Sequence, residues 1–174
     1  MARRILVVPV NHGAGVTAAC LGLVHALENL HVPVGFCKPF AQARAFGEDH
    51  STELFRLATS LRPPRPIAVE ELEQGLAVGT LRGIMTRVVE LTADMDVDSR
   101  VLVLEGLAPG VEQVYSDRMN IEISQALDTE VLLVGAAGEL APDRFAAQVA
   151  AAERLYVARG ESRVVGVLIN HIVD

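Results

Sequence analysis

The residues of this chain that could do chemistry begin in a loop after the first apolar run. Residues 9–17 read Pro-Val-Asn-His-Gly-Ala-Gly-Val-Thr and follow Ile-Leu-Val-Val at residues 5–8. A strand, a glycine-bearing turn and a helix make a phosphate-binding geometry, because the first N–H groups of the helix and its positive dipole end face an anion. The loop therefore predicts binding of a phosphate-bearing ligand.

This loop departs from the full phosphate-loop motif, which reads G-x-x-x-x-G-K-[ST]. Gly15 and Thr17 match the second glycine and the hydroxyl residue, but Val16 stands at the lysine position. The first glycine position falls on Val10 or Asn11, depending on register. The scaffold of a phosphate loop is thus present, whereas the residue that neutralises the β- and γ-phosphates is missing.

Polar residues also follow the later apolar runs, at the strand ends where open parallel sheets bind ligands. The Thr17 hydroxyl is placed to reach Mg²⁺, and Asp49 and Glu105 offer carboxylates to the same ion. Lys38 could pair with a substrate anion or a γ-phosphate, and Asn170 could read an adenine edge. Each residue also has a plain structural alternative, such as a solvated strand-end charge or a loop cap. The expected nucleotide site comprises Asn11, Gly13, Gly15, Val16, Thr17, Lys38 and Asn170, and the expected Mg²⁺ ligands are Thr17, Asp49 and Glu105.

Alternating strand and helix patterns must position these residues. Continuous Val, Leu and Ile runs predict buried parallel strands at residues 5–10, 34–37, 101–104, 131–135 and 164–169. Helices are expected at 16–30, at 51–61 with Ser51 as cap, at 69–78, at 80–93 after a break at Gly79, at 120–127, and from Pro142 to a stop near Gly160. The pattern predicts a doubly wound, mainly parallel α/β sheet with helices on both faces.

Length, net charge and cysteine content limit the classes of function that this chain can have. The chain has 174 residues, which predicts one domain, and its net charge of −7 argues against nucleic acid as a partner. Two cysteines, Cys20 and Cys37, are expected to be buried reduced thiols of a cytoplasmic protein, with no signal peptide, no membrane span and no structural metal. The triad Asp94, Asp96 and Asp98 lacks the glycine and glutamate of a calcium loop, so a solvated turn is expected.

Several segments, in the same order along the chain, resemble the N-terminal domain of long-form bacterial phosphate acetyltransferase. They are the loop at 9–17, Val-Gly-Phe-Cys-Lys-Pro-Phe-Ala-Gln at 34–42, Val-Leu-Val-Leu-Glu-Gly-Leu at 101–107, Asn-Ile-Glu-Ile-Ser-Gln-Ala-Leu at 120–127 and Val-Gly-Val-Leu-Ile-Asn at 165–170. That domain is itself similar to dethiobiotin synthetase and to the ATP-binding part of cobyrinic acid amide synthases. The resemblance implies a P-loop NTPase-like, dethiobiotin synthetase-like fold over residues 1–174.

For function, the resemblance implies a regulatory and assembly domain in acetate metabolism. In phosphate acetyltransferases, acetyl transfer between acetyl phosphate and coenzyme A belongs to a separate C-terminal domain, so no residue here is expected to be catalytic. The implied partners are that C-terminal domain, like subunits in a homo-oligomer, and a small-molecule effector. Neither nucleic acid nor a membrane is an expected partner.

The relation to dethiobiotin synthetase assigns roles position by position. There the matching threonine and acidic residues bind Mg²⁺, and the lysine of the Lys-Pro pair engages substrate and phosphates. Thr17, Lys38, Asp49, Glu105 and Asn170 are retained, whereas Val16 and Asn11 depart from the lysine and the first glycine. Because phosphoryl transfer depends on charges clamped around the transferring group, these departures argue against ATP hydrolysis.

Two alternatives remain open. The retained residues also fit an active ATP-dependent ligase of the dethiobiotin synthetase or cobyrinic acid amide synthase type, with Mg-ATP as cofactor. A pure interaction module with a vestigial pocket and no cofactor is the other alternative.

Overall fold

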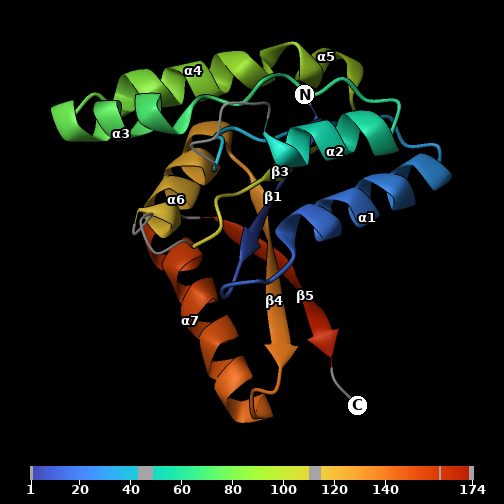
Figure 1. The fold of residues 1–174 in the computed structure, drawn as a ribbon, viewed down its shortest axis with the longest axis vertical. Coiled ribbons are helices and arrows are strands. Elements are labelled where there is room, and N and C mark those ends of the chain that lie inside the picture. Colours follow the sequence, from blue (N-terminus) through green and yellow to red (C-terminus); the bar gives the residue numbers. More distant parts are fainter. Residues whose placement is uncertain (1, 43–48, 110–114, 161, 173–174) are drawn as a thin grey trace.

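The computed structural model describes residues 2–42, 49–109, 115–160 and 162–172 as an α/β protein (Figure 1). Helices alternate with strands along most of the chain. The elements are β1 (Arg3–Pro9), α1 (Val16–Asn29), β2 (Val34–Cys37), α2 (His50–Ala58), α3 (Val69–Val78), α4 (Leu81–Ala93), α5 (Met95–Asp98), β3 (Val101–Glu105), α6 (Ser116–Leu127), β4 (Glu130–Gly138), α7 (Pro142–Gly160) and β5 (Arg163–Ile172).

The five strands form one parallel sheet in the order β2-β3-β1-β4-β5. The connection after β1 crosses to one side of the sheet, whereas the connections after β3 and β4 cross to the other side. The loops after β1 and β3 therefore leave the sheet in opposite directions. This is the topological switch point at which open α/β sheets bind ligands. The fold predicted from the strand and helix patterns is confirmed.

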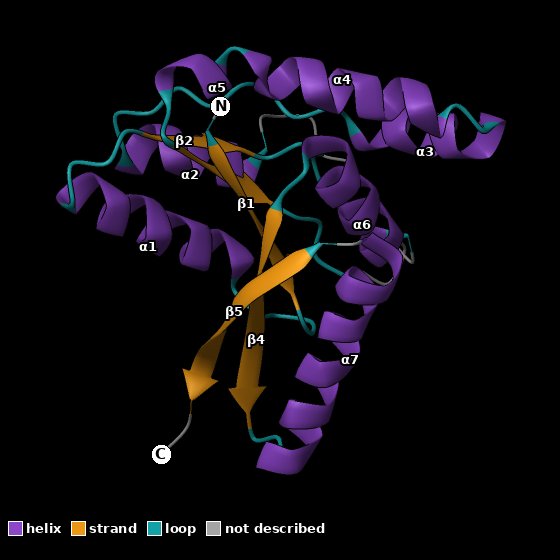
Figure 2. Cartoon of the chain, turned by 180° about the vertical axis from the view of Figure 1, so that it is seen from behind, coloured by secondary structure: helices purple, strands orange, loops and turns teal. Residues whose placement is uncertain are grey.

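Helices cover both faces of the sheet (Figure 2), and an apolar cluster fills the space on each face. Alternate residues of β1 divide between them: Leu6 and Val8 lie in the cluster under α3, α4, α6 and α7, and Val7 lies in the cluster under α1 and α2. On the second face, Phe36 of β2 and Phe55 of α2 stack with their ring centroids 3.4 Å apart. This stack fixes α2 on the sheet, and with it the residues at the start of α2.

Three local predictions were wrong. Helix α2 begins at His50 and its cap is Asp49, whose Oδ1 accepts from the Thr52 N–H at 3.2 Å, so Ser51 lies inside the helix. Residues 95–98 form the short helix α5 instead of a solvated turn. Helix α6 begins at Ser116, four residues before the expected start, because the polar residues preceding 120 continue its first turn.

Other local predictions hold. Gly79 ends α3 with a φ of +75°, in the left-handed region where glycine carries no steric cost. Cys20 and Cys37 are both free and buried, as expected. Burial raises the pKa of Cys37 to about 12, and burial together with the charge of Glu105 raises the pKa of Cys20. Within the described ranges, no helix is long and apolar enough to cross a membrane.

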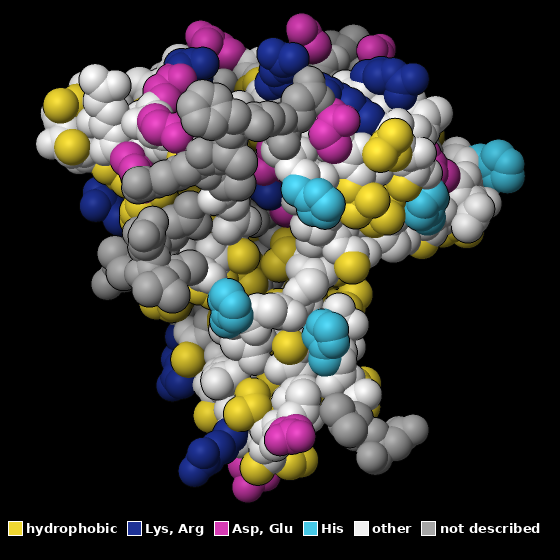
Figure 3. Space-filling view, viewed as in Figure 1, with side chains coloured by type: hydrophobic (Ala, Val, Ile, Leu, Met, Phe, Trp, Pro, Cys, Tyr) yellow, Lys and Arg dark blue, Asp and Glu magenta, His cyan; other side chains and the backbone are white. Residues whose placement is uncertain are grey.

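Strand β5 leaves apolar side chains uncovered at the edge of the sheet. Val167, Ile169 and Ile172 are 41%, 48% and 70% exposed. Figure 3 shows hydrophobic side chains at the surface of the lower part of the molecule, where β4 and β5 end, interspersed with charged side chains. An uncovered edge strand of this kind offers a surface for association.

Candidate phosphate-loop site

The loop between β1 and α1 has the backbone of an anion-binding turn. Gly13 and Gly15 have φ values of +71° and +77°, and Gly15 is the N-cap of α1. A Cβ added at Gly15 would lie 2.7 Å from Nδ2 of Asn170, so a larger residue would have to displace that side chain as well as adopt a backbone angle that favours glycine. The first N–H groups of α1 are thus presented at the switch point of the sheet.

Two asparagines hold this loop against β4 and β5. The Asn11 side chain accepts from the N–H of Ala136 and donates to its carbonyl, both at 2.9 Å, and it also donates to Gln148 at 3.1 Å. Nδ2 of Asn170 donates to the Ala14 carbonyl at 3.3 Å. Asn11, one of the two positions on which the first glycine of the motif could fall, thus makes side-chain hydrogen bonds instead. An adenine contact by Asn170 stays a prediction.

Behind the loop, four of the expected residues form one buried cluster. Nζ of Lys38 lies 3.1 Å from Oε1 of Glu105 and 3.2 Å from Oδ2 of Asp49. Thr17 Oγ1 donates to the same Glu105 oxygen at 3.0 Å. The side chains of Lys38, Asp49 and Glu105 are at most 5% exposed. The structure therefore brings together the expected metal ligands and the expected phosphate-binding lysine.

A fifth member, Ser51, was not predicted as a site residue. Its Oγ accepts from Lys38 at 2.9 Å, donates to Glu105 at 2.8 Å and lies 3.0 Å from Thr17 Oγ1. In the sequence Ser51 looked like a helix cap. Its spacing from Asp49 is the only signal that could have indicated it, because both belong to the start of α2 and face the same strand ends.

Neighbouring elements position these groups. Lys38 directly follows β2 and Glu105 ends β3, and the register pairs Cys37 with Leu104, so the two side chains leave adjacent strands at the same level. Thr17 is the second residue of α1. The start of α2 is brought over them by the stacking of Phe36 on Phe55 described above. The five members thus come from four parts of the chain, the ends of β2 and β3 and the starts of α1 and α2, and their meeting depends on the packing of the sheet.

The charges of the cluster do not balance. Two carboxylates, Asp49 and Glu105, face one ammonium group, which leaves a net charge of −1 when all three are ionised. Oε1 of Glu105 accepts hydrogen bonds from Thr17 and Ser51 and forms an ion pair with Lys38, whereas its Oε2 is buried and has no hydrogen-bond partner among the described residues. An unsatisfied buried polar atom costs about 1–3 kcal/mol. Such a buried, unbalanced group of charges is weak as a source of stability.

The donor set fits a hard cation. Carboxylate and hydroxyl oxygens are the ligands that Mg²⁺ prefers, and the unpartnered Glu105 oxygen is a free donor of that kind. Across the described ranges, no group of three His, Cys, Asp or Glu side chains could hold a metal ion. A cation here would thus use the hydroxyls of Thr17 and Ser51 together with the two carboxylates.

Val16 supplies no charge to this site. It is buried in the apolar cluster under α1, together with Val7, Ala19 and Cys20. The position at which the motif carries its lysine is therefore apolar in environment as well as in residue type.

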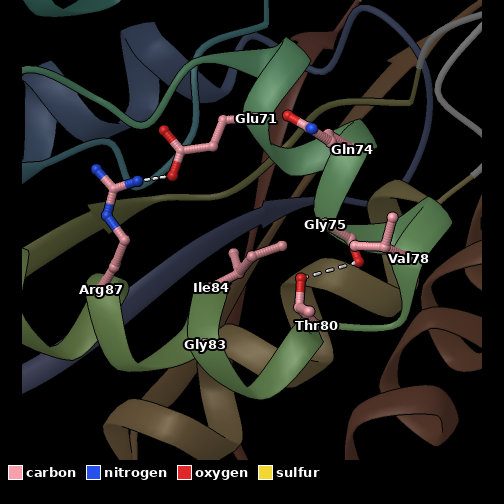
Figure 4. A pocket seen from close by; sticks show the side chains of 8 residues that line it. All are labelled: Glu71, Gln74, Gly75, Val78, Thr80, Gly83, Ile84 and Arg87. Carbon is pink, nitrogen blue, oxygen red and sulfur yellow. Dashed lines mark hydrogen bonds and ion pairs between the residues drawn. The ribbon is translucent and has the colours of Figure 1, made fainter.

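Two hollows lie away from the cluster. A groove of about 410 Å³ runs between α3 and α4 and is lined by Gly75, Val78 and Ile84, with an ion pair between Glu71 and Arg87 at one end (Figure 4). A second hollow, of about 270 Å³, lies beside the end of β1 and is lined in part by residues of α6 and α7. Neither hollow is lined by the charged residues of the cluster.

Comparison with known proteins decides the family. A family model described as an AAA domain matches residues 3–174. The chain belongs to this family. It is 32% identical over 173 residues to the phosphate acetyltransferase of Haemophilus influenzae, covering 98% of this chain and 24% of that protein. It is 31% identical over 168 residues to the phosphate acetyltransferase of Pseudomonas putida, covering 95% of this chain and 24% of that protein.

The matched part is the N-terminal region of these relatives, so the resemblance seen in the sequence is confirmed. The chain spans about a quarter of the length of the curated relatives it matches. It therefore corresponds to the N-terminal domain of the long form of phosphate acetyltransferase.

Solved structures agree on the fold. The kinase domain of the Escherichia coli tyrosine kinase ETK superposes with a TM-score of 0.65 at 12% identity, over 99% of this chain and 69% of that one. The signal recognition particle receptor FtsY of Elizabethkingia anophelis superposes with a TM-score of 0.64 at 14% identity, over 97% of this chain and 50% of that one. These likenesses establish a P-loop NTPase-like α/β fold and carry no statement about activity.

Proposed function

We propose that this chain is the regulatory and assembly domain of a phosphate acetyltransferase and that its phosphate loop does not transfer phosphoryl groups. The relatives it matches carry that name, and the match occupies about a quarter of their length. The reaction of acetyl-CoA and phosphate to acetyl phosphate and coenzyme A then belongs to the remaining part of the protein. The domain's own contribution is subunit assembly and the response to a small-molecule effector.

The observation that carries this proposal is the pairing of Lys38. Its ammonium group is held by Asp49 and Glu105, while the motif's lysine position is the buried Val16. Phosphoryl transfer needs positive charge clamped around the transferring group. In this arrangement no lysine of the loop or the cluster is free to supply it.

One observation favours a second candidate, an ATP-dependent ligase of the dethiobiotin synthetase or cobyrinic acid amide synthase type. Thr17, Asp49 and Glu105, the metal ligands that the resemblance implies, lie within one cluster, and one carboxylate oxygen there is unpartnered. A loaded Mg-ATP site would use those same oxygens.

Two assays on the purified chain test the proposal. With acetyl-CoA and phosphate, we expect no acetyl phosphate. With ATP and Mg²⁺, we expect no ADP above the protein-free control, whether the added substrates are diaminopelargonic acid and bicarbonate or a cobyrinate and an amide donor. Acetyl phosphate formation by this chain would contradict the domain assignment, and substrate-dependent ADP formation would establish the ligase instead.

The regulatory role has its own test in the longer protein. Deleting the region equivalent to residues 3–174 from a long-form relative is expected to leave acetyl transfer in place while changing the oligomeric state and the response to metabolites. Light scattering and initial rates with and without candidate metabolites measure both. A deletion that changes neither would contradict the assignment.

A further inference from the structure

We propose that Lys38 is a resident cation that occupies the place of a divalent metal ion in this phosphate-loop site, so that Lys38 pairing and metal binding exclude one another. The inference rests on the proposed function only in placing the ligand site at the loop between β1 and α1. It goes beyond that function because it identifies the cation of the site as the ammonium group of Lys38 and not a metal ion.

The geometry puts the ammonium group inside the set of oxygens that a metal ion would need. Nζ of Lys38 lies 2.9 Å from Oγ of Ser51, 3.1 Å from Oε1 of Glu105 and 3.2 Å from Oδ2 of Asp49. Thr17 Oγ1 completes the set, since it donates to Glu105 at 3.0 Å and lies 3.0 Å from Oγ of Ser51. The ammonium group thus donates a hydrogen bond to Ser51 and forms ion pairs with both carboxylates.

A metal ion and this ammonium group cannot share the cluster. Mg²⁺ takes its oxygens at about 2.0–2.1 Å and requires near-octahedral placement. Glu105 Oε1 and Asp49 Oδ2 already contact Nζ, so an ion bound by them would lie against a second positive charge. Coulomb repulsion at such a distance is strong wherever water is excluded, and the side chains of Lys38, Asp49 and Glu105 are at most 5% exposed.

Removing Lys38 would turn the cluster into a divalent site. Without it, Asp49 and Glu105 carry a charge of −2 that nothing in the cluster compensates. Glu105 Oε2, which has no partner among the described residues, would then share the ion with Oε1 and the two hydroxyls. A divalent cation is the simplest group that neutralises this arrangement, because the freed oxygens are hard ligands.

The test is a titration with Mn²⁺ alone, in which the free ion is followed by its electron paramagnetic resonance signal. We expect Lys38→Met to bind one Mn²⁺ per chain at least tenfold more tightly than the wild type, since methionine keeps the apolar stem but removes the charge. The double variant Lys38→Met/Glu105→Gln should lose this gain. A melting temperature that rises with Mn²⁺ in Lys38→Met, and not in the wild type, should accompany it.

Equal Mn²⁺ affinity of the wild type and Lys38→Met would overturn the proposal, and so would a gain that survives Glu105→Gln. Lys38→Gln serves as a second variant if the methionine does not fold, with the same expected direction. Tight stoichiometric binding of Mn²⁺ by the wild type would by itself contradict the proposal, whatever the variants do. Since no nucleotide or acetyl donor is present, these outcomes are independent of the assays of the proposed function.

Discussion

Lys38 is the residue on which the site depends most. It is the one positive charge in the cluster with Asp49 and Glu105, and its side chain is 5% exposed. Breaking a buried pair by removing one partner is far more damaging than removing both, because it leaves an uncompensated charge in the interior. The effect of a substitution here therefore depends on which sign of charge it removes.

Lys38→Met is expected to lower the free energy of unfolding by about 3–5 kcal/mol, because two carboxylates lose the cation that pairs with them in the described part of the chain. Glu105→Gln should cost clearly less, since Lys38 and Asp49 then balance. Urea unfolding of both variants at neutral pH measures the difference. Equal losses for the two variants would mean that packing, not charge, dominates at this position.

The two thiols give a second prediction at this scale. Burial raises the pKa of Cys37 to about 12, so this thiol stays protonated at pH 8, and the pKa of Cys20 is raised as well. Only the thiolate reacts readily. A disulfide reagent at pH 8 should therefore find no rapidly reacting thiol in the folded chain and two after unfolding in urea. Fast modification of the folded protein would contradict the buried placement.

At the scale of elements, the phosphate loop depends on glycine for two separable reasons. Gly13 and Gly15 both have positive φ values, but only at Gly15 would a Cβ meet a neighbouring atom, Nδ2 of Asn170 at 2.7 Å. At Gly13 the added Cβ would meet nothing within 4 Å. An L-residue would thus have a strained backbone at both positions, whereas a steric clash would arise only at Gly15.

Gly13→Ala is expected to lower the free energy of unfolding by about 1–2 kcal/mol, the cost of a left-handed backbone for an L-residue. Gly15→Ala should cost more, because the Asn170 side chain must also move. The matched control is Gly22→Ala in the interior of α1, where an added Cβ meets nothing and a gain of about 0.5–1 kcal/mol is expected. Thermal or urea unfolding ranks the three. If Gly13→Ala lowered the free energy of unfolding as much as Gly15→Ala, the contact with Asn170 would not contribute to the cost at Gly15.

Elements made of continuous apolar residues were predicted well from the sequence, whereas polar segments were not. The strand at 34–37 is a continuous apolar run whose four residues are all buried, and its predicted and observed bounds coincide. The aspartates at 94, 96 and 98 looked like a turn, but an α-helical turn at Met95–Asp98 follows directly on α4. Ser51 could not be predicted as a site residue, because its contacts to Lys38 and Glu105 depend on the packing of α2 across the sheet.

At the scale of the whole molecule, the two edges of the sheet differ. All four residues of β2 are buried, whereas most residues of β5 are exposed to solvent. The uncovered apolar residues of β5 follow one another along a free edge. Such a surface favours pairing with another strand or another copy of the chain.

The purified 174-residue chain is therefore expected to self-associate as its concentration rises, and Ile169→Lys/Ile172→Lys should reduce that association. Leu57→Lys is the matched control, because Leu57 is 83% exposed but lies on α2, away from β5. Sedimentation velocity over a range of concentrations measures the effect. Equal reduction by the control would show that net charge, and not the β5 edge, governs association.

The central claim is that this phosphate loop is disabled at Val16 while Lys38 is held by the carboxylates behind it. A calorimetric titration of Mg²⁺-ATP into the wild-type chain and the Val16→Lys variant tests it most directly. We expect no measurable heat of binding for the wild type and binding in the micromolar range for Val16→Lys. Micromolar binding to the wild type would contradict the claim, because Thr17, Lys38 and Glu105 would then form a working nucleotide site without the missing lysine.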